Sequence, residues 1–250
     1  NHIEEGDMYE LNFCMAFNFE SQNWNPITGF RDLMEKSPMP FSSLFKAKDK
    51  YLIGASPERF LKKAGNQLIA QPIKGTIRRG KDAEEDLSLK NQLLNSEKER
   101  AENLMIVDLL RNDLSRVCTP GSVKVPALFH IERYPTVHQM ISVIEGRLQP
   151  KTGLPEILAA MFPCGSVTGA PKIRAMEIIH ELEAEPRGAY CGSIGWASPE
   201  GDMEFNVAIR TLTETGDGQY RLNVGGGIVH DSRAEDEYEE ALWKARFLKT

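Results

Sequence analysis

The sequence predicts an α+β fold in which antiparallel β-sheets pack on each other with helices outside. Strand-like segments arrive in runs separated by tight turns, predicted helices arrive in pairs, and the regular alternation of strand and helix typical of a parallel α/β sheet is absent. The chain has 250 residues, of which 41% are hydrophobic, so a sizeable core is possible. With no repeat, low-complexity tract or linker in view, we expect residues 1–250 to form one domain.

The first third of the chain predicts strands joined by short turns. β-rich runs with partial alternation mark the strands Met8–Phe19, Phe41–Ala47, Tyr51–Ala55 and Gln67–Ile73. A short helix from Phe30 to Lys36 is ended by Pro38. The turn Ala64-Gly65-Asn66 predicts a hairpin between the last two strands.

The remaining elements follow from helical apolar stripes, caps and further β-rich runs. Ser96 and Glu99 form a predicted capping box at the start of a long helix. The expected helices are Asp82–Asn95, Ser96–Leu114, Leu154–Met161, Ala170–Glu183 and Ala234–Leu248. The expected strands lie near Val123 and Leu128, and at Val137–Leu148, Ala189–Ala197, Met203–Thr213 and Tyr220–Val229.

Composition excludes several classes of function. The formal charge of −6, with no basic cluster, argues against a nucleic-acid surface. No apolar run is long enough for a membrane span, and no signal peptide opens the chain. The spacing of the four cysteines predicts neither a disulfide framework nor a zinc site and favours a reducing, cytoplasmic setting. Because the chain starts without methionine close to a predicted interior strand, we interpret it as part of a longer protein.

The central stretch of the sequence contains an acid and an amine sixteen residues apart, Glu58 and Lys74. The predicted hairpin would bring them to neighbouring strand ends. A carboxyl group that donates a proton, facing an amine that attacks, suits covalent substitution of a hydroxyl. The alternative interpretation is a surface salt bridge beside a Pro-Gly turn.

Two predicted helices carry acidic pairs at i, i+3 spacing. Glu99 and Glu102 share one helix face, and Glu237 and Glu240 share another, which Lys244 extends. Carboxylates of this kind hold Mg²⁺ together with substrate oxygens. A solvated acidic face on each helix is the alternative.

Glycine-rich segments precede two of the predicted helices. Gly225-Gly226-Gly227 offers bare backbone N–H groups that suit an anion, although the glycines equally suit a bulge or close packing. The turn from Gly165 to Lys172 lacks the spacing of a phosphate loop, so nucleotide binding is rejected.

Three single residues also suggest chemistry. Arg210 follows an apolar strand and suits a carboxylate. His138 lies in a strand, where a structural role is the alternative to catalysis. Cys164 has no neighbouring base and is interpreted as structural.

Together these motifs resemble the chorismate-utilising enzymes, a family that includes anthranilate, aminodeoxychorismate, isochorismate and salicylate synthases. The similar segments are residues 6–12, 55–60, 72–76, 99–113, 165–176, 191–196, 208–211 and 225–244. The resemblance implies a chorismate-binding catalytic domain, with N-terminal strands of the full-length family missing here.

The resemblance also implies a role for each site residue. Glu102 and Glu240 would bind Mg²⁺ directly, supported by Glu99 and Glu237. The metal would grip the ring carboxylate of chorismate, together with Lys244 and backbone N–H groups around Gly225 and Gly227. Arg210 and Tyr190 would hold the enolpyruvyl carboxylate, and Ser166 would contact a substrate carboxylate. His138 would lie near the ring, and Glu58 would protonate the departing 4-hydroxyl.

Two positions distinguish the branches of this family. Lys74 matches the Pro-Ile-Lys-Gly-Thr motif of aminodeoxychorismate synthases, where anthranilate synthases usually have alanine. Isochorismate and salicylate synthases have a lysine at position 10 to activate water, and amine-using branches usually have glutamine. Glu10 is neither, which argues against a water-using enzyme and leaves its own role open. Asn103 replaces a histidine common in the family.

The resemblance therefore favours conversion of chorismate and ammonia to 4-amino-4-deoxychorismate, towards 4-aminobenzoate and folate, through a covalent adduct on Lys74. Because the chain has no glutaminase Cys-His-Glu set, ammonia from glutamine would need a partner amidotransferase subunit. The alternatives are an anthranilate synthase component and a non-catalytic chorismate-binding subunit.

Overall fold

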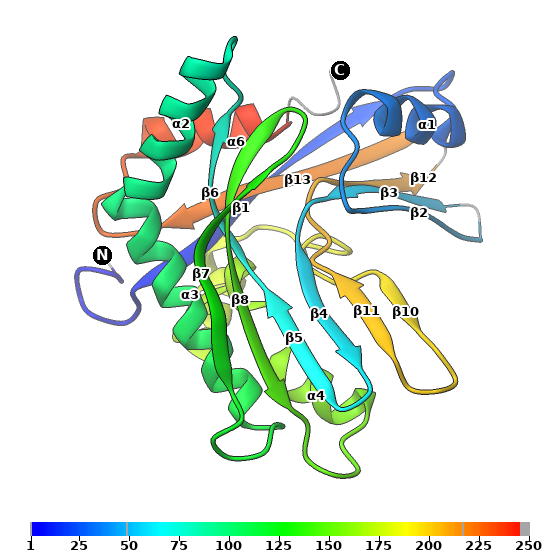
Figure 1. Ribbon diagram of the computed structural model, residues 1–250. Helices are drawn as coiled ribbons and strands as arrows, with labels where there is room; N and C mark the ends of the chain where they lie inside the picture. The colour runs from blue at the N-terminus through cyan, green and yellow to red at the C-terminus, as the bar shows by residue number, and fades with distance from the viewer. Residues whose placement is uncertain (1, 49, 217, 246–250) are drawn as a thin grey trace. The chain divides into compact units, whose positions relative to one another are not determined.

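The computed structural model describes residues 2–48, 50–216 and 218–245 (Figure 1). It divides into two compact units, each of which contains one antiparallel sheet. The first unit comprises residues 1–58, 167–194 and 206–250, and the second comprises residues 59–166 and 195–205. The prediction of antiparallel sheets combined with helices is confirmed.

The first unit is built on a six-stranded sheet of order β2-β3-β12-β13-β1-β9. Its longest pairing joins β1 to β13, from Leu11 opposite Ile228 to Glu20 opposite Gln219. The strands are β1 (Glu10–Glu20), β2 (Phe41–Ala47), β3 (Lys50–Ser56), β9 (Gly169–Ala170), β12 (Thr211–Gly216) and β13 (Gln219–Ile228).

Three helices belong to the first unit: α1 (Pro26–Lys36), α5 (Lys172–Leu182) and α6 (Ala234–Ala245). A core cluster joins α1, α6 and the sheet through residues that include Leu33, Ile53, Leu222 and Ala241. A smaller cluster packs Leu11 of β1 on Ala175 and Ile178 of α5.

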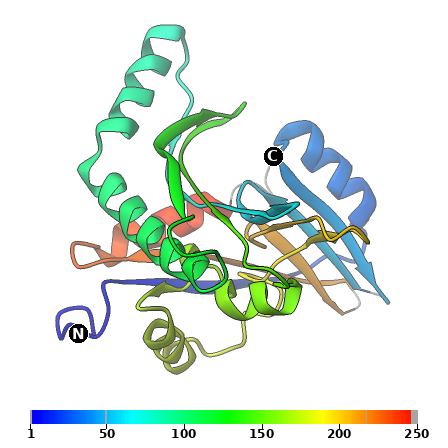
Figure 2. The same cartoon turned by 60° about the horizontal axis from the view of Figure 1, so that its bottom comes forward.

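The second unit is built on a seven-stranded sheet of order β10-β11-β4-β5-β8-β6, with β7 also paired to β8. Its strands are β4 (Arg59–Ala64), β5 (Gln67–Gln71), β6 (Ile73–Arg78), β7 (Lys124–Arg133), β8 (Val137–Arg147), β10 (Gly195–Ala197) and β11 (Met203–Asn206). The helices are α2 (Ala83–Asn95), α3 (Glu97–Ser115) and α4 (Leu154–Met161). Figures 1 and 2 show α3 running beside β8, with which it is in contact.

Local sequence signals predicted some helix starts correctly and missed others. Ser96 caps α3 as predicted, because its hydroxyl accepts a hydrogen bond from the Glu99 N–H. α1 begins at Pro26, earlier than predicted, because Asn25 caps it and proline suits the first helical turn. α4 has the predicted bounds, and the predicted residues 246–248 of the last helix lie outside the described residues.

The predicted hairpin between Tyr51–Ala55 and Gln67–Ile73 is wrong in its first strand. The turn at Gly65 instead joins β4 to β5, while β3 pairs with β2 and β12 in the other sheet. Lys74 lies in a separate strand, β6, which pairs with β8. The hairpin therefore does not itself place Lys74 beside Glu58.

Two long predicted strands are also shorter than expected. Met203–Thr213 divides into β11 and β12, because the chain turns at Arg210, whose φ is +48°. Ala189–Ala197 reduces to β10, and Cys191 in its first part has φ +63°. A positive φ is incompatible with regular strand geometry.

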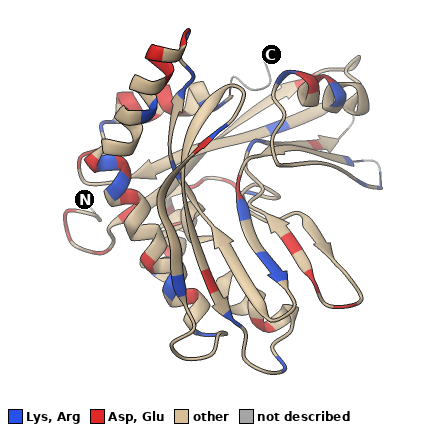
Figure 3. Cartoon of the chain, in the orientation of Figure 1, with Lys and Arg blue, Asp and Glu red and all other residues tan. Residues whose placement is uncertain are grey.

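Surface charge and cysteine usage agree with the composition. In Figure 3, Lys and Arg are interspersed with Asp and Glu along the helices. Cys14, Cys118, Cys164 and Cys191 are free thiols. Among the described residues, no helix is both long and apolar enough to cross a membrane.

Candidate functional site

Lys74 lies in a β-bulge of the second unit. Ile73 pairs with Ile141 and Thr76 pairs with Gln139, so both Lys74 and Gly75 stand opposite the single residue between those partners. Gly75 has φ +91°, a conformation that glycine adopts without strain. Bulges re-aim side chains, and this one turns Lys74 towards α3, where Nζ lies 3.9 Å from Oε2 of Glu102.

The acidic pair on α3 lies beside this bulge. A Cβ at Gly75 would stand 2.8 Å from Oε2 of Glu99, so β6 lies close to the Glu99 side chain at this point. The side chains of Lys74 and Glu102 are 10% and 12% exposed, against 55% for Lys98, which also lies 3.9 Å from Glu102. The Glu102 carboxylate, one turn from Glu99 on α3, thus lies beside an amine with little exposure to solvent.

The second acidic pair forms a separate group in the first unit. Around the point where Gly226 would carry a Cβ lie Oε2 of Glu237 at 3.2 Å, Nζ of Lys244 at 3.5 Å and Oε1 of Glu240 at 3.7 Å. Lys244 contacts Oε1 of Glu240 at 2.6 Å and donates a hydrogen bond to the Gly225 carbonyl at 2.9 Å. The missing side chain of Gly226 therefore leaves a cradle lined by carboxylates and an ammonium.

Each acidic pair fits a hard divalent cation by its donor chemistry. Carboxylate oxygens are the protein ligands that Mg²⁺ prefers, and one or two from the protein are typical of its sites. Glu99 and Glu102 belong to the second unit, and Glu237 and Glu240 to the first.

Tyr190 and Arg210 lie on two segments of the first unit that are hydrogen-bonded to each other. The Cys191 N–H donates to the Ala208 carbonyl, and the Ala208 N–H donates to the Gly192 carbonyl. Burial lowers the pKa of Arg210 and raises that of Tyr190 well above its usual value. Within the described residues the Arg210 guanidinium has no acidic partner, so it suits an anion supplied from outside the chain.

The other predicted residues of the two units are buried. Glu10 is fully buried in β1, with its Cα opposite Ala170 of β9. Glu58 is 3% exposed, and its carbonyl accepts the Val207 N–H. Ser166 is 6% exposed, with its hydroxyl 3.2 Å from Sγ of Cys164.

His138 is held by an acid that the sequence did not reveal. Its Nε2 lies 3.0 Å from Oδ1 of Asp86, and the guanidinium of Arg79 donates to both oxygens of that carboxylate at 2.7 Å. These bonds and the Gly80 N–H hold the pKa of Asp86 well below its usual range. The contact with Asp86 anchors the His138 imidazole to the start of α2.

Asn103 is fully buried on α3. Its Oδ1 accepts a hydrogen bond of 2.5 Å from Ser142 of β8, whose hydroxyl also accepts the Phe129 N–H at 3.1 Å. The residue therefore ties α3, which carries Glu102, to the sheet. The sequence offered no signal for this contact, because it depends on which faces of α3 and β8 meet.

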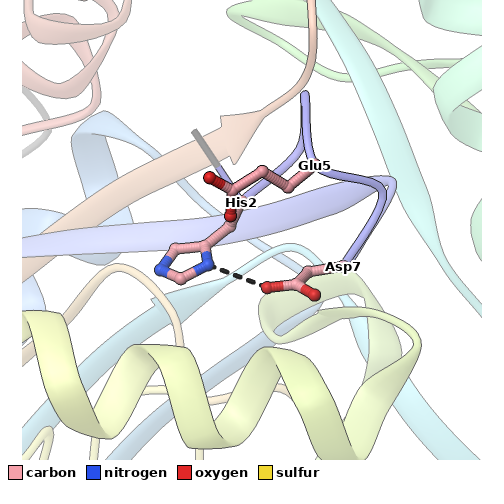
Figure 4. Close-up of side chains that lie close together, drawn as sticks. All are labelled: His2, Glu5 and Asp7. Atoms are coloured by element: carbon pink, nitrogen blue, oxygen red, sulfur yellow. Dashed lines mark hydrogen bonds and ion pairs between the residues drawn. The ribbon is translucent and has the colours of Figure 1, made fainter.

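One further cluster of potential ligands lies at the beginning of the chain. Donor atoms of His2, Glu5 and Asp7 lie within 4.8 Å of one another (Figure 4). Asp7 already contacts His2 at 2.9 Å and the Arg174 guanidinium at 3.0 Å. Because Asp7 already joins His2 to Arg174 of α5, we interpret this cluster as a tether between the segment before β1 and α5.

Known proteins resemble the chain over its full length. The family model described as chorismate binding enzyme matches residues 1–250. Aminodeoxychorismate synthase component 1 of Salmonella typhimurium is 46% identical over 97% of this chain and 53% of its own length. Anthranilate synthase component 1 of Saccharolobus solfataricus is 45% identical over 100% of this chain and 59% of its own.

A solved structure agrees with these relatives. Anthranilate synthase component I from Streptococcus pneumoniae superposes with a TM-score of 0.90 at 38% identity, covering 100% of this chain and 55% of that one. The chain thus spans between half and three fifths of the length of each of these three relatives. On this match of sequence and fold, the chain belongs to the family of chorismate binding enzymes.

Proposed function

We propose that this chain is the catalytic part of an aminodeoxychorismate synthase component I, which converts chorismate and ammonia to 4-amino-4-deoxychorismate. The single observation that carries the proposal is Lys74, in a β-bulge that turns its amine towards Glu102. A lysine placed for solubility would extend into water, as Lys98 does. The name of the Salmonella typhimurium relative, aminodeoxychorismate synthase component 1, supports the proposal.

The reaction proceeds in two substitutions. The uncharged Lys74 amine forms a bond to C2 of chorismate, and the 4-hydroxyl leaves as water with the proton of Glu58. Ammonia then forms a bond to C4, the bond from C2 to the Lys74 nitrogen breaks, and the spare proton returns to Glu58. Chorismate and ammonia thereby give aminodeoxychorismate and water, with both side chains restored.

The remaining residues bind and orient the substrate. Mg²⁺ held by Glu102 and Glu240, with Glu99 and Glu237 in support, would neutralise the ring carboxylate of chorismate. Lys244 and the backbone around Gly225 and Gly227 would contact the same carboxylate. Arg210 and Tyr190 would hold the enolpyruvyl carboxylate, Ser166 a substrate carboxylate, and His138 would lie near the ring.

The cellular setting completes the proposal. We infer that a glutamine amidotransferase subunit supplies the ammonia, because the name of the Salmonella relative designates it component 1. The product would feed 4-aminobenzoate and folate synthesis. The four free thiols favour a reducing cytoplasm.

Product analysis and intact-protein mass spectrometry test the proposal. Chorismate, Mg²⁺ and ammonium should give aminodeoxychorismate, and chorismate without ammonia should give a protein adduct. Lys74→Ala should abolish the adduct and slow the reaction at least about a hundredfold, or roughly 2.7 kcal/mol of barrier. Lys98→Ala is the matched control, since it removes another lysine 3.9 Å from Glu102 and should keep the adduct.

Three outcomes would contradict the proposal. Anthranilate as the wild-type product would indicate the other amine-using branch, to which the Saccharolobus relative belongs by name. Full aminodeoxychorismate synthesis by Lys74→Ala would show that the lysine is a bystander. Absence of any turnover by the wild type with ammonium would favour a non-catalytic subunit.

A further inference from the structure

Ser232 lies in the turn between β13 and α6, and its hydroxyl makes two hydrogen bonds. Oγ donates to Oε1 of Glu237 at 2.6 Å and accepts the Val229 N–H at 3.1 Å. The Ser232 N–H donates in return to the Val229 carbonyl at 3.0 Å. The hydroxyl has one proton, and this arrangement directs it to Glu237.

The orientation of this hydroxyl differs from that of a helix cap. A serine just before a helix usually accepts a hydrogen bond from an N–H of the first helical turn. Ser232 accepts from Val229, upstream of the helix that begins at Ala234. Capping therefore does not explain the contact with Glu237.

The contact with Ser232 gives the two carboxylate oxygens of Glu237 different surroundings. Oε1 is fixed by Ser232, and Oε2 lies 3.2 Å from the absent Cβ of Gly226, in the cradle that also contains Glu240 and Lys244. An unrestrained glutamate side chain samples many rotamers, and fixing it costs conformational entropy. A short bond from a hydroxyl to a carboxylate offsets part of this cost before a ligand arrives.

We propose that Ser232 is a positioning residue for Glu237, holding Oε2 ready to support a divalent cation in the Gly226 cradle. The inference rests on the proposed function for the assignment of a cation to these carboxylates. It adds a residue of the turn, outside the acidic pairs, to the set that determines metal affinity. It does not depend on which amine product is formed.

Direct metal binding tests this role. The probe is Mn²⁺, titrated into the full chain with and without chorismate and followed by electron paramagnetic resonance. Ser232→Ala should raise the Mn²⁺ dissociation constant about tenfold or more, the range for loss of a group that orients a metal ligand. Threonine and valine side chains have nearly the same shape, but only threonine keeps the hydroxyl. Ser232→Val should therefore lose Mn²⁺ affinity while Ser232→Thr keeps it. This pair replaces Ser232→Ala as the test if the alanine variant unfolds the turn.

A double-mutant cycle shows whether Ser232 acts through Glu237. On a Glu237→Gln background, Ser232→Ala should cause little further loss of affinity. Asp231→Asn removes an exposed neighbouring acid and should leave the dissociation constant within about twofold.

Three results would overturn the inference: unchanged affinity in Ser232→Val, an equal loss on the Glu237→Gln background, or no Mn²⁺ binding by the wild type in either condition. If the wild type binds Mn²⁺ but releases anthranilate, the proposed function fails and the role of Ser232 stands.

Discussion

Nζ of Lys74 lies 3.9 Å from Oε2 of Glu102, although the two residues belong to different elements, β6 and α3. The pair joins the proposed nucleophile to a proposed metal ligand within one unit of the fold. Changes at either residue should therefore affect both the amine and the metal requirement.

The first prediction concerns Glu102. Glu102→Gln removes a carboxylate charge beside Lys74 and a proposed ligand, so activity should fall severely and half-maximal rate should need more Mg²⁺. Initial rates measured across a Mg²⁺ series provide the test. The control is Asp236→Asn, which changes an exposed acid 3.8 Å from Arg233 and should have little effect. Wild-type activity that survives exhaustive chelation would eliminate the metal site.

The second prediction concerns Gly75. Gly75→Ala forces a side chain into a backbone conformation of φ +91° and places its Cβ 2.8 Å from Oε2 of Glu99 and 3.0 Å from Leu93, so the bulge is strained and the Glu99 carboxylate must move aside. We expect a loss of about 1–3 kcal/mol in urea unfolding, together with loss of the Lys74 adduct. Gly121→Ala is the matched control, because it has φ +75° with nothing within 4 Å, and it should cost stability while preserving adduct formation. Equal adduct yields in both variants would refute the positioning role of the bulge.

The third prediction concerns Arg210. Because its partly buried guanidinium has no acidic partner among the described residues, Arg210→Ala should raise the KM for chorismate at least about tenfold, the loss of a charge-assisted hydrogen bond. Arg210→Lys keeps the charge but not the bidentate fork and should restore only part of the affinity. Steady-state kinetics with Arg233→Ala as an exposed control measure the effect. An unchanged KM in Arg210→Ala would exclude substrate contact.

The fourth prediction concerns stability in acid. The pKa of Asp86 is lower in the folded chain than its ordinary value of 3.8, so its contribution is present above that value and is lost as pH falls below it. Asp86→Asn should therefore lower Tm at neutral pH and flatten the fall of Tm between about pH 5 and pH 2. Thermal melts across this range measure the effect, and Asp108→Asn, an exposed partner of Arg111, is the comparison. Parallel acid limbs for wild type and Asp86→Asn would contradict the assignment.

Elements specified by local chemistry were predictable from the sequence. The α4 helix and the Ser96 cap depend on residues within one or two turns, and both were found where expected. The partner of β3 was not predictable, because its pairing with β12 joins residues far apart in the chain. The break at Arg210 was missed for a similar reason: an apolar run favours strand, while its positive φ is set by the segments packed around it.

In the candidate site, too, local sequence patterns were informative and long-range contacts were not predictable. Motifs supplied the candidate residues, including Lys74, Glu102 and Arg210, whose roles stay predictions. The partners that fix side chains were invisible, since Asp86 meets His138 and Ser232 meets Glu237 through register and rotamers. A sequence pattern describes the residues along one helix or strand, whereas these side-chain contacts join residues of different elements.

The pairing of β1 with β13 makes completion of the first sheet a late event during synthesis. Leu11 pairs with Ile228, so the ribosome must deliver everything between β1 and β13 before the two strands can meet. Most of the second unit lies in the uninterrupted stretch from Arg59 to Ser166, which emerges earlier and closes shorter loops. A nascent chain stalled before Gln219 would leave the long edge of β1 exposed, and such edges template aggregation.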